Sequence, residues 1–213
     1  MTLEKFELLG GNLSLDFVNT IHHYGGTDPQ EDLLEFGDLI AFAKQSSAIG
    51  SRDAAELHAV AKNNRSLADR SLADARNFRL SLYRIFSAIA SGKSPGRPDL
   101  DSLNAHLGSA YRNLRIENKN RRLEWSWNRK NQALDRVLWP VVRSAAELLT
   151  SEDRPKLHEC ESETCTWLFL DGSKNGTRRW CDMKRCGNRA KWHRHYEKNK
   201  PQRRRARKVE KNA

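Results

Sequence analysis

The chain has 213 residues, enough for one sizeable domain and a smaller one. Hydrophobic residues make up 38% of the chain and charged residues 31%, and no stretch approaches the roughly 18 apolar residues of a membrane-spanning helix. The acidic, polar start MTLEKFELLGGNLSLDF lacks the basic segment and apolar run of a signal peptide. These features exclude a helical membrane protein, and we expect a cytoplasmic protein with no membrane partner.

The net charge of +11 is concentrated at one end of the chain. Residues 174–213 contain 16 lysines and arginines against three acidic residues, whereas residues 1–173 contain 22 against 24. A strongly basic segment attached to a nearly neutral domain is typical of proteins that bind polyanions. We therefore expect the binding surface in the C-terminal part, followed by a basic disordered tail over residues 200–213.

The spacing of apolar residues predicts a mostly helical domain over residues 1–150. Asn12 is a candidate N-cap of the first helix and Ser51 of the third. Alternating apolar and polar residues predict one small β-hairpin, with strands near 113–117 and 122–127. Helices are expected over about 14–23, 31–44, from Ser51 onward, 66–91, 99–111 and 131–150, the last one bent at Pro140.

All four cysteines lie within 27 consecutive residues, in the order C-x4-C-x15-C-x4-C. In a reducing cytoplasm such clustering favours a metal site over disulfides. Four thiolates fill the coordination shell of one tetrahedral Zn²⁺, so the expected ion is structural and its ligands are Cys160, Cys165, Cys181 and Cys186. Buried free thiols, a disulfide and an iron–sulfur cluster are alternatives, and the possible substitute ligands are His158, His193 and His195.

The sequence around the cysteines predicts a second domain over residues 151–199, with SEDRPKLHE as the bridge. TWLFLD is a predicted strand, GSKNG a turn and TRRWC the antiparallel partner, and a helix is expected over about 184–198. The result is a treble-clef-like ββα module, so the overall fold class is α+β. A module this small could hardly fold without its metal.

The same residues also carry a family resemblance. The stretch CESETCTWLFLDGSKNGTRRWCDMKRCGNRAKWHRHY, residues 160–196, resembles the CGNR zinc-finger family, named for the tetrapeptide found here at residues 186–189. LSLDFVNTI at 13–21 and VLWPVVRSAAELLT at 137–150 resemble the ABATE domain, which accompanies this finger in stress-induced bacterial transcription regulators. Together the resemblances cover nearly the whole chain and imply a DNA-binding finger.

The basic residues of the finger are the candidates for contact with nucleic acid. Lysines and arginines at this density cannot all be ion-paired locally, and phosphate contacts supply most sequence-independent affinity. The candidate residues are Lys174, Arg178, Arg179, Lys184, Arg185, Asn188, Arg189, Lys191 and Arg194. Charge compensation of the zinc thiolates is the alternative for the arginines. For Asn188 and Gly187 the alternative is a role in the turn, whereas Asn188 and Arg189 could also read base edges.

The aromatic residues of the finger are expected to pack inside it. Trp167 and Trp180 are predicted to form a small core. For Trp192 and Tyr196 core packing is favoured, although both could stack on bases.

Residues 1–150 contain no phosphate-binding loop, nucleophile motif or zinc helix, so we expect no enzyme. Asp16, Asn19 and Thr20, with Arg79 from the long helix, either line a small-molecule pocket or are satisfied core polar groups. The leading hypothesis is a transcription regulator with a sensor domain and a finger that binds double-stranded DNA. A small-molecule effector and a homodimer are the further partners that this hypothesis allows. The alternatives are a protein that grips structured RNA and an enzyme that the finger delivers to nucleic acid.

Overall fold

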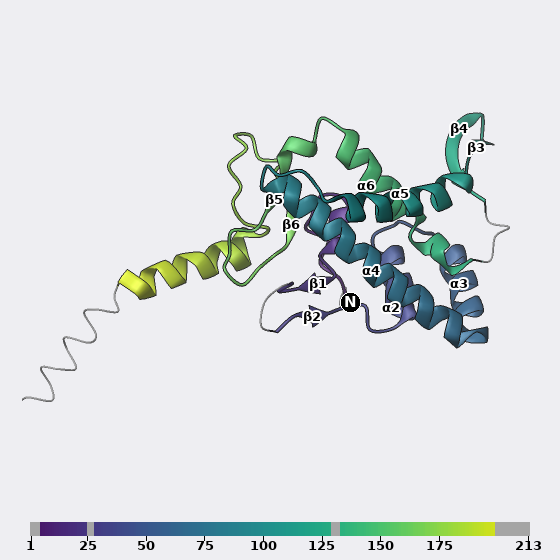
Figure 1. Ribbon diagram of the computed structural model, residues 1–213, viewed down its shortest axis with the longest axis horizontal. Helices are drawn as coiled ribbons and strands as arrows, with labels where there is room; N and C mark the ends of the chain where they lie inside the picture. Colours follow the sequence, from purple (N-terminus) through teal and green to yellow (C-terminus); the bar gives the residue numbers. More distant parts are fainter. Residues whose placement is uncertain (1–4, 25–27, 129–132, 199–213) are drawn as a thin grey trace, which may run out of the picture.

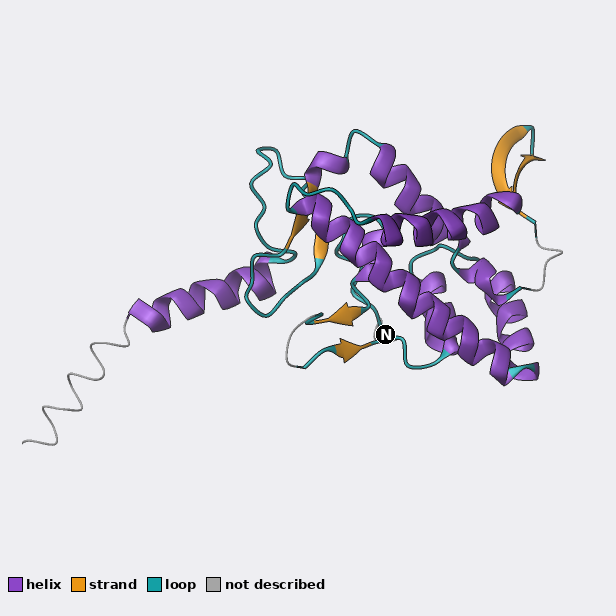
Figure 2. Cartoon of the chain, in the orientation of Figure 1, coloured by secondary structure: helices purple, strands orange, loops and turns teal. Residues whose placement is uncertain are grey.

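Helices dominate the computed structural model, which describes residues 5–24, 28–128 and 133–198 (Figures 1 and 2). Each of the three sheets in this part of the chain is a two-stranded antiparallel hairpin, so the α+β fold class is confirmed. In chain order the elements are α1 (Leu13–Val18), β1 (Ile21–His22), β2 (Gln30–Glu31), α2 (Phe36–Gln45), α3 (Ser51–Asn63), α4 (Arg65–Ala90), α5 (Arg97–Arg112), β3 (Leu114–Lys119), β4 (Arg122–Trp127), the 3-10 turn η1 (Leu134–Val137), α6 (Trp139–Thr150), the 3-10 turn η2 (Arg154–Lys156), β5 (Leu157–Glu159), β6 (Leu168–Leu170) and the π-helical turn η3 (Met183–Gly187), which leads into a helix over residues 188–198.

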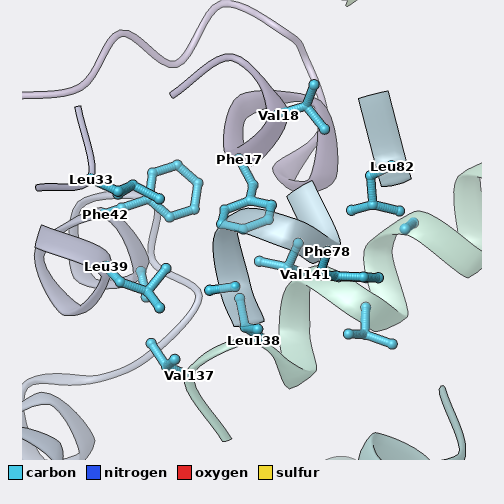
Figure 3. Packing of buried hydrophobic residues seen from close by; sticks show 14 of the residues in the cluster. Phe17, Val18, Leu33, Leu39, Phe42, Phe78, Leu82, Val137, Leu138 and Val141 are labelled. Carbon is cyan, nitrogen blue, oxygen red and sulfur yellow. The ribbon is translucent and has the colours of Figure 1, made fainter. Parts of the chain in front are cut away.

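The long helix α4 runs through the centre of the helical body (Figure 1). Its buried face presents Phe78 and Leu82, which lie beside Phe17 of α1 and Val141 of α6 in the core (Figure 3). Full burial of each such side chain contributes about 1.5–3 kcal/mol. The predicted helix over 66–91 is confirmed and gains an N-cap, because the side chain of Asn64 accepts the Leu67 amide proton at 3.0 Å. None of the described helices is long and apolar enough to span a membrane.

The first two helices are shorter than the sequence predicts. Asn12 caps α1 as expected, but the helix ends at Val18, because the Thr20 hydroxyl donates to the Phe17 carbonyl and the chain turns into β1. The β1–β2 hairpin, in which Ile21 pairs with Glu31, therefore occupies residues predicted to be helical. The second helix begins at Phe36, after a capping box between Glu35 and Asp38.

The remaining elements of the helical body follow the predictions with two corrections. The β3–β4 hairpin is confirmed, but Gly50 is the N-cap of α3 and Ser51 is its first residue. The predicted helix over 131–150 is a 3-10 turn followed by α6, and residues 131–132 lie outside the described residues. Pro140 falls in the first turn of α6 and does not bend it, because that position has no amide bond to lose.

The hairpin of the finger differs from the prediction. Strand β6 pairs with β5, with Leu157 opposite Leu170, and not with TRRWC. Asp171 is the reason: its carboxylate accepts the amide protons of Ser173 and Arg178, each at 2.8 Å, and so holds the returning segment as a loop. The predicted bridge SEDRPKLHE therefore supplies a strand of the finger.

The finger packs directly against the helical body. Leu157 and Leu168 belong to the main core, and the Leu170 amide donates to the Gly10 carbonyl at 2.9 Å. On the other side of the hairpin, the Tyr83 hydroxyl of α4 donates to Glu159 of β5 at 2.8 Å. These contacts combine hydrophobic burial with hydrogen bonds between the finger and the helical body.

Candidate metal centre and nucleic-acid interface

The four cysteine sulfur atoms converge on one point of the finger, within 4.8 Å of one another. The Sγ atoms of Cys165 and Cys181 are 3.7 Å apart, and those of Cys181 and Cys186 are 3.6 Å apart. A tetrahedral zinc ion with Zn–S bonds of about 2.3 Å requires sulfur atoms about 3.8 Å apart. The observed separations therefore fit one zinc ion and are too long for a disulfide bond.

The backbone around the cysteines sets their positions. Cys160 follows β5, and the turn to Cys165 closes through a 2.8 Å hydrogen bond from the Cys165 amide to the Ser162 carbonyl. The Cys160 amide donates to the Trp167 carbonyl at 2.9 Å. Cys186 lies in the turn η3, where the Asp182 side chain caps the turn by accepting the Lys184 amide proton at 3.0 Å. A thiolate there is also favoured by the N-terminal dipole of the following helix.

Without a cation, the thiols compete for negative charge. The pKa of Cys160 is lowered to about 2, because the thiols of Cys165 and Cys181 hydrogen-bond to its sulfur. The pKa of Cys181 is raised instead, by its hydrogen bond to Cys160 and then by the neighbouring thiol of Cys165 and burial. A zinc ion removes this conflict because it binds all four groups as thiolates. The four cysteines thus form a site for one structural zinc ion.

The histidines named as substitute ligands do not join the cluster. Among the described residues, the cluster of potential ligands consists of the four cysteines alone. The His158 ring lies 6.0 Å from the Phe169 ring and stacks on it, while His193 and His195 are exposed on the helix over residues 188–198.

Comparison with known families gives two matches in the expected order. Residues 11–152 match the model of ABATE, described as "Putative stress-induced transcription regulator". The chain belongs to the ABATE family. Residues 156–199, which contain all four zinc ligands, match the CGNR zinc finger. No curated protein matches the chain.

Most of the predicted nucleic-acid residues lie on the surface of the CGNR finger. The side chains of three of them have partners within the protein: Arg179 pairs with Glu161, Arg185 pairs with Glu7, and Arg189 donates to the Thr164 hydroxyl. Four others are exposed and have no ion-pair partner within the described residues: Lys174, Lys184, Lys191 and Arg194. The structure therefore places eight of the nine candidates, Asn188 included, at the finger surface.

Arg178 is the exception, because its guanidinium points into the finger. Its Nε donates to the Trp180 carbonyl at 3.0 Å, and Nη2 donates to the Cys181 carbonyl. The same group lies 4.4 Å from the centre of the Phe169 ring. Arg178 thus stabilises the segment that carries the zinc ligand Cys181, and its guanidinium does not face the finger surface.

The tetrapeptide of the CGNR finger has a clear structural role in the turn beneath the zinc site. The Asn188 side chain donates to the Lys184 carbonyl at 2.9 Å, so its amide group closes the turn η3 onto the helix. A Cβ atom at Gly187 would displace the exposed side chain of Met183 and touch the Trp180 ring at 3.5 Å. The hydrogen bond of Asn188 supports the turn role that the sequence leaves open for this residue.

The aromatic residues of the CGNR finger divide into two groups. Trp167 is buried and Trp180 is half-buried against the cysteines, as predicted. The prediction of core packing for Trp192 and Tyr196 is wrong, since they are 64% and 43% exposed. Their rings stack on each other, with centroids 5.4 Å apart, because no described element covers this helix.

The polar side chains predicted in the ABATE domain have hydrogen-bond partners in its core, except that Nε of Arg79 has none among the described residues. The Asn19 amide pairs with both backbone groups of Leu168, each at 2.9 Å, and so joins α1 to the finger. Arg79, 1% exposed, donates to the Thr20 hydroxyl at 2.8 Å and forms an ion pair with Glu31. The structure brings Thr20 and Arg79 together, whereas Asn19 faces the finger and Asp16 accepts the Gly10 amide proton at 2.8 Å.

Several partners at these contacts have no motif in the sequence. Glu31 neutralises Arg79, Glu7 pairs with Arg185, and Glu159 accepts hydrogen bonds from Tyr83 and Ser87. Only the position of Arg79 on the apolar face of α4 could have predicted one of them from the sequence. A buried arginine requires a carboxylate partner, which here is Glu31.

Replacing Asp16 with asparagine is expected to stabilise the protein above pH 6. Burial raises the pKa of Asp16 from 3.8 to about 6, although the hydrogen bond from Gly10 opposes the shift. Between pH 3.8 and about 6 the folded state therefore keeps a proton that the unfolded state has lost. The free energy of unfolding of the wild type falls as the pH rises through this range. At about 1.4 kcal/mol per pKa unit, the ionised carboxylate lowers that free energy by about 2–3 kcal/mol at pH 8.

Urea unfolding of the wild type and Asp16→Asn at two pH values measures this effect. Asparagine keeps an oxygen for the Gly10 amide, so the variant should gain about 1 kcal/mol more at pH 8 than at pH 5. An equal change in unfolding free energy at both pH values would show that Asp16 is not held in its neutral form by the fold.

Proposed function

We propose that this ABATE protein regulates transcription by binding double-stranded DNA through its CGNR finger. The ABATE domain is proposed to respond to a ligand or stress signal and to transmit that response through the contacts that join it to the finger. The description of the ABATE family supports the regulatory role. The zinc finger and the exposed cations on its surface support DNA binding.

The observation that carries the proposal is the exposed cationic helix over residues 188–198. It projects from the body of the protein (Figure 1), and only Ala190 is even partly buried. Arg189, Lys191, Arg194 and Lys198 are exposed on it. An α-helix fits the major groove of B-DNA, where its cations contact phosphates on both sides and its tip faces base edges.

A groove beside this helix extends the cationic surface. Its volume is about 350 Å³, and it lies between the helix and the turn that carries Cys160 and Cys165. Its lining includes Arg179, Arg189 and Arg194 together with Trp180, and it also includes Glu161, which pairs with Arg179, and Glu163. Three arginines against two carboxylates leave the lining cationic, and an arginine can bind a phosphate group bidentately. The groove therefore supports contact with a nucleic-acid backbone at this face.

Structured RNA is a second candidate because of Trp192 and Tyr196. Two stacked and exposed rings among cations form a platform on which unpaired bases can stack. Duplex DNA offers no unpaired base to such a platform. Trp192→Ala would therefore weaken RNA binding by an RNA regulator but leave duplex binding by a DNA regulator nearly unchanged.

Competition between the two nucleic acids tests the proposal. Zinc-loaded protein is titrated with labelled duplex DNA, with a structured RNA of equal length as competitor, at several salt concentrations. The proposal predicts that the DNA complex resists the RNA and that its affinity falls linearly on a logarithmic salt scale. Preferential release of DNA by the RNA would favour the second candidate.

A further inference from the structure

A cavity of about 210 Å³ lies at the far end of the ABATE domain from the finger. It is lined by residues at the start of α3, on strand β4 and where η1 meets α6. Figure 1 shows α3 and the β3–β4 hairpin at the end of the helical body that lies away from the finger. The apolar part of its lining is formed by Ile49, Leu57, Trp125, Trp127 and Trp139. None of the four residues first considered as a ligand site lines it.

The three tryptophans give this cavity flat walls. The rings of Trp127 and Trp139 are 5.6 Å apart and tilted by 47°, and the Trp139 indole donates to Asp135 at 3.3 Å. Trp125 is 55% exposed, and the guanidinium of Arg143 from α6 lies 5.2 Å from its ring centre. Aromatic walls of this kind favour a planar ring between them, in tilted or offset contact.

Arg136 supplies a polar group that the protein leaves unused. Its side chain is 8% exposed, lines the cavity and donates from Nη2 to Glu56 at 3.1 Å. Its Nε is shielded from solvent and has no hydrogen-bond partner among the described residues. Nε of Arg79 and Oδ1 of Asp135 also lack a partner among the described residues, but neither residue lines the cavity. Buried donors are normally satisfied, so a molecule in the cavity with an acceptor atom would complete the hydrogen bonding of Arg136.

The second charged residue of the lining, Asp53, does not accept a hydrogen bond from Nε of Arg136. It lies in the first turn of α3, beside the N-cap Gly50, where the helix dipole favours a carboxylate. Glu56 remains ionised, because its hydrogen bonds to Arg52 and then Arg136 lower its pKa. Glu56 is therefore a charged partner of Arg136, held at Nη2.

We propose that this cavity is a binding site for a small planar aromatic molecule that carries a carboxylate or amide oxygen. The ring would lie among Trp125, Trp127 and Trp139, and the oxygen would accept the hydrogen bond from Nε of Arg136. The volume is below the roughly 300 Å³ of sites for drug-sized ligands, so the site suits a single substituted ring. The inference deepens the proposed sensing role and rests on it for its biological meaning, but not for the binding itself.

Nuclear magnetic resonance of the indole N–H groups can test the site directly in the full-length, zinc-loaded protein. The chain has six tryptophans, of which three line the cavity and three lie in the finger. Benzoate and benzamide should shift the signals of Trp125, Trp127 and Trp139 to saturation and leave the finger signals in place. Benzylammonium, which has no acceptor, and cyclohexanecarboxylate, which has no aromatic ring, should bind at least tenfold more weakly.

Two variants separate binding in the cavity from binding elsewhere. Arg136→Gln should lower the affinity for benzoate at least tenfold, and Ala48→Phe should do so by filling the cavity while Arg136 stays in place. Ala59→Phe, at an exposed position of α3 outside the lining, is the matched control and should bind as the wild type does.

Failure of the three cavity signals to shift with either benzoate or benzamide would overturn the proposal, as would equal affinity in wild type and Ala48→Phe. The titration contains no DNA, so its result is independent of whether the finger binds DNA. Conversely, a protein that binds these rings but no duplex would contradict the proposed function and keep the site.

Discussion

Chelation of the zinc ion is expected to unfold the CGNR finger and to leave helices α2 to α6 folded. Structural zinc sites contribute on the order of 10 kcal/mol to the folding of small fingers. The small core around the cysteines, formed by Trp167 and Phe169, cannot replace that contribution. The helical body has its own core around α4, so it should survive.

The finger also stabilises the helical body, so unfolding of the finger should destabilise the body in turn. Asn19 and Gly10 lose their backbone partners on β6 when the hairpin opens, and each unsatisfied buried group costs about 1–3 kcal/mol. We therefore expect the midpoint of thermal unfolding of the body to fall on chelation, in addition to loss of the helix over residues 188–198.

Metal analysis and hydrogen exchange measure both effects. The purified protein should contain one zinc ion per chain, and chelation should remove exchange protection at residues 168–170. Cys186→Ala should behave like the chelated protein, whereas Lys184→Ala, two residues away and exposed, should keep its zinc. A metal-free protein with full protection at β6 would contradict the assignment.

Reversal of three cations on the projecting helix is expected to abolish duplex binding at physiological salt. Lys191, Arg194 and Lys198 are exposed and have no ion-pair partner within the described chain, so their replacement by glutamate disturbs no contact of the fold. Each lost phosphate contact reduces the slope of log affinity against log salt by about 0.9. Three such losses, with added repulsion, should lower the affinity by about 100-fold or more near 0.15 M salt.

The matched control reverses three exposed cations on the opposite part of the protein, Lys62, Arg65 and Arg70. It has the same net charge as the first variant and should bind DNA nearly as the wild type does. Zinc content and circular dichroism verify that both variants fold. Equal loss of binding in the two variants would mean that overall charge, and not this helix, governs the interaction.

Local chemistry explains which parts of the fold can be predicted from the sequence. Strong periodicity predicts α4 and the β3–β4 hairpin, and the cysteine spacing predicts the zinc ligands, because each signal is contained in a short stretch. The β1–β2 hairpin has two residues per strand, too few for an alternating pattern. Its position depends on the ion pair between Arg79 and Glu31, which are 48 residues apart.

The site shows the same division between local and distant causes. A cluster of arginines predicts a cationic surface. The neighbouring sequence does not predict that Arg178 turns inward, because its partners are carbonyl groups positioned by Asp171 and the zinc turn. Exposure of Trp192 depends on the helix leaving the body, so composition alone favours the wrong environment. The cavity beside Arg136 brings together residues 48–57, 125–128 and 136–139, which only the tertiary fold does.

Selection of genomic fragments by the purified, zinc-loaded protein, followed by sequencing, tests most directly whether the finger recognises DNA. The account predicts a recurrent sequence motif, bound at least about 1,000-fold more tightly than unrelated duplex of equal length and lost with the triple variant on residues 191, 194 and 198. Recovery of fragments without a shared motif, in amounts that the triple variant does not change, would contradict it.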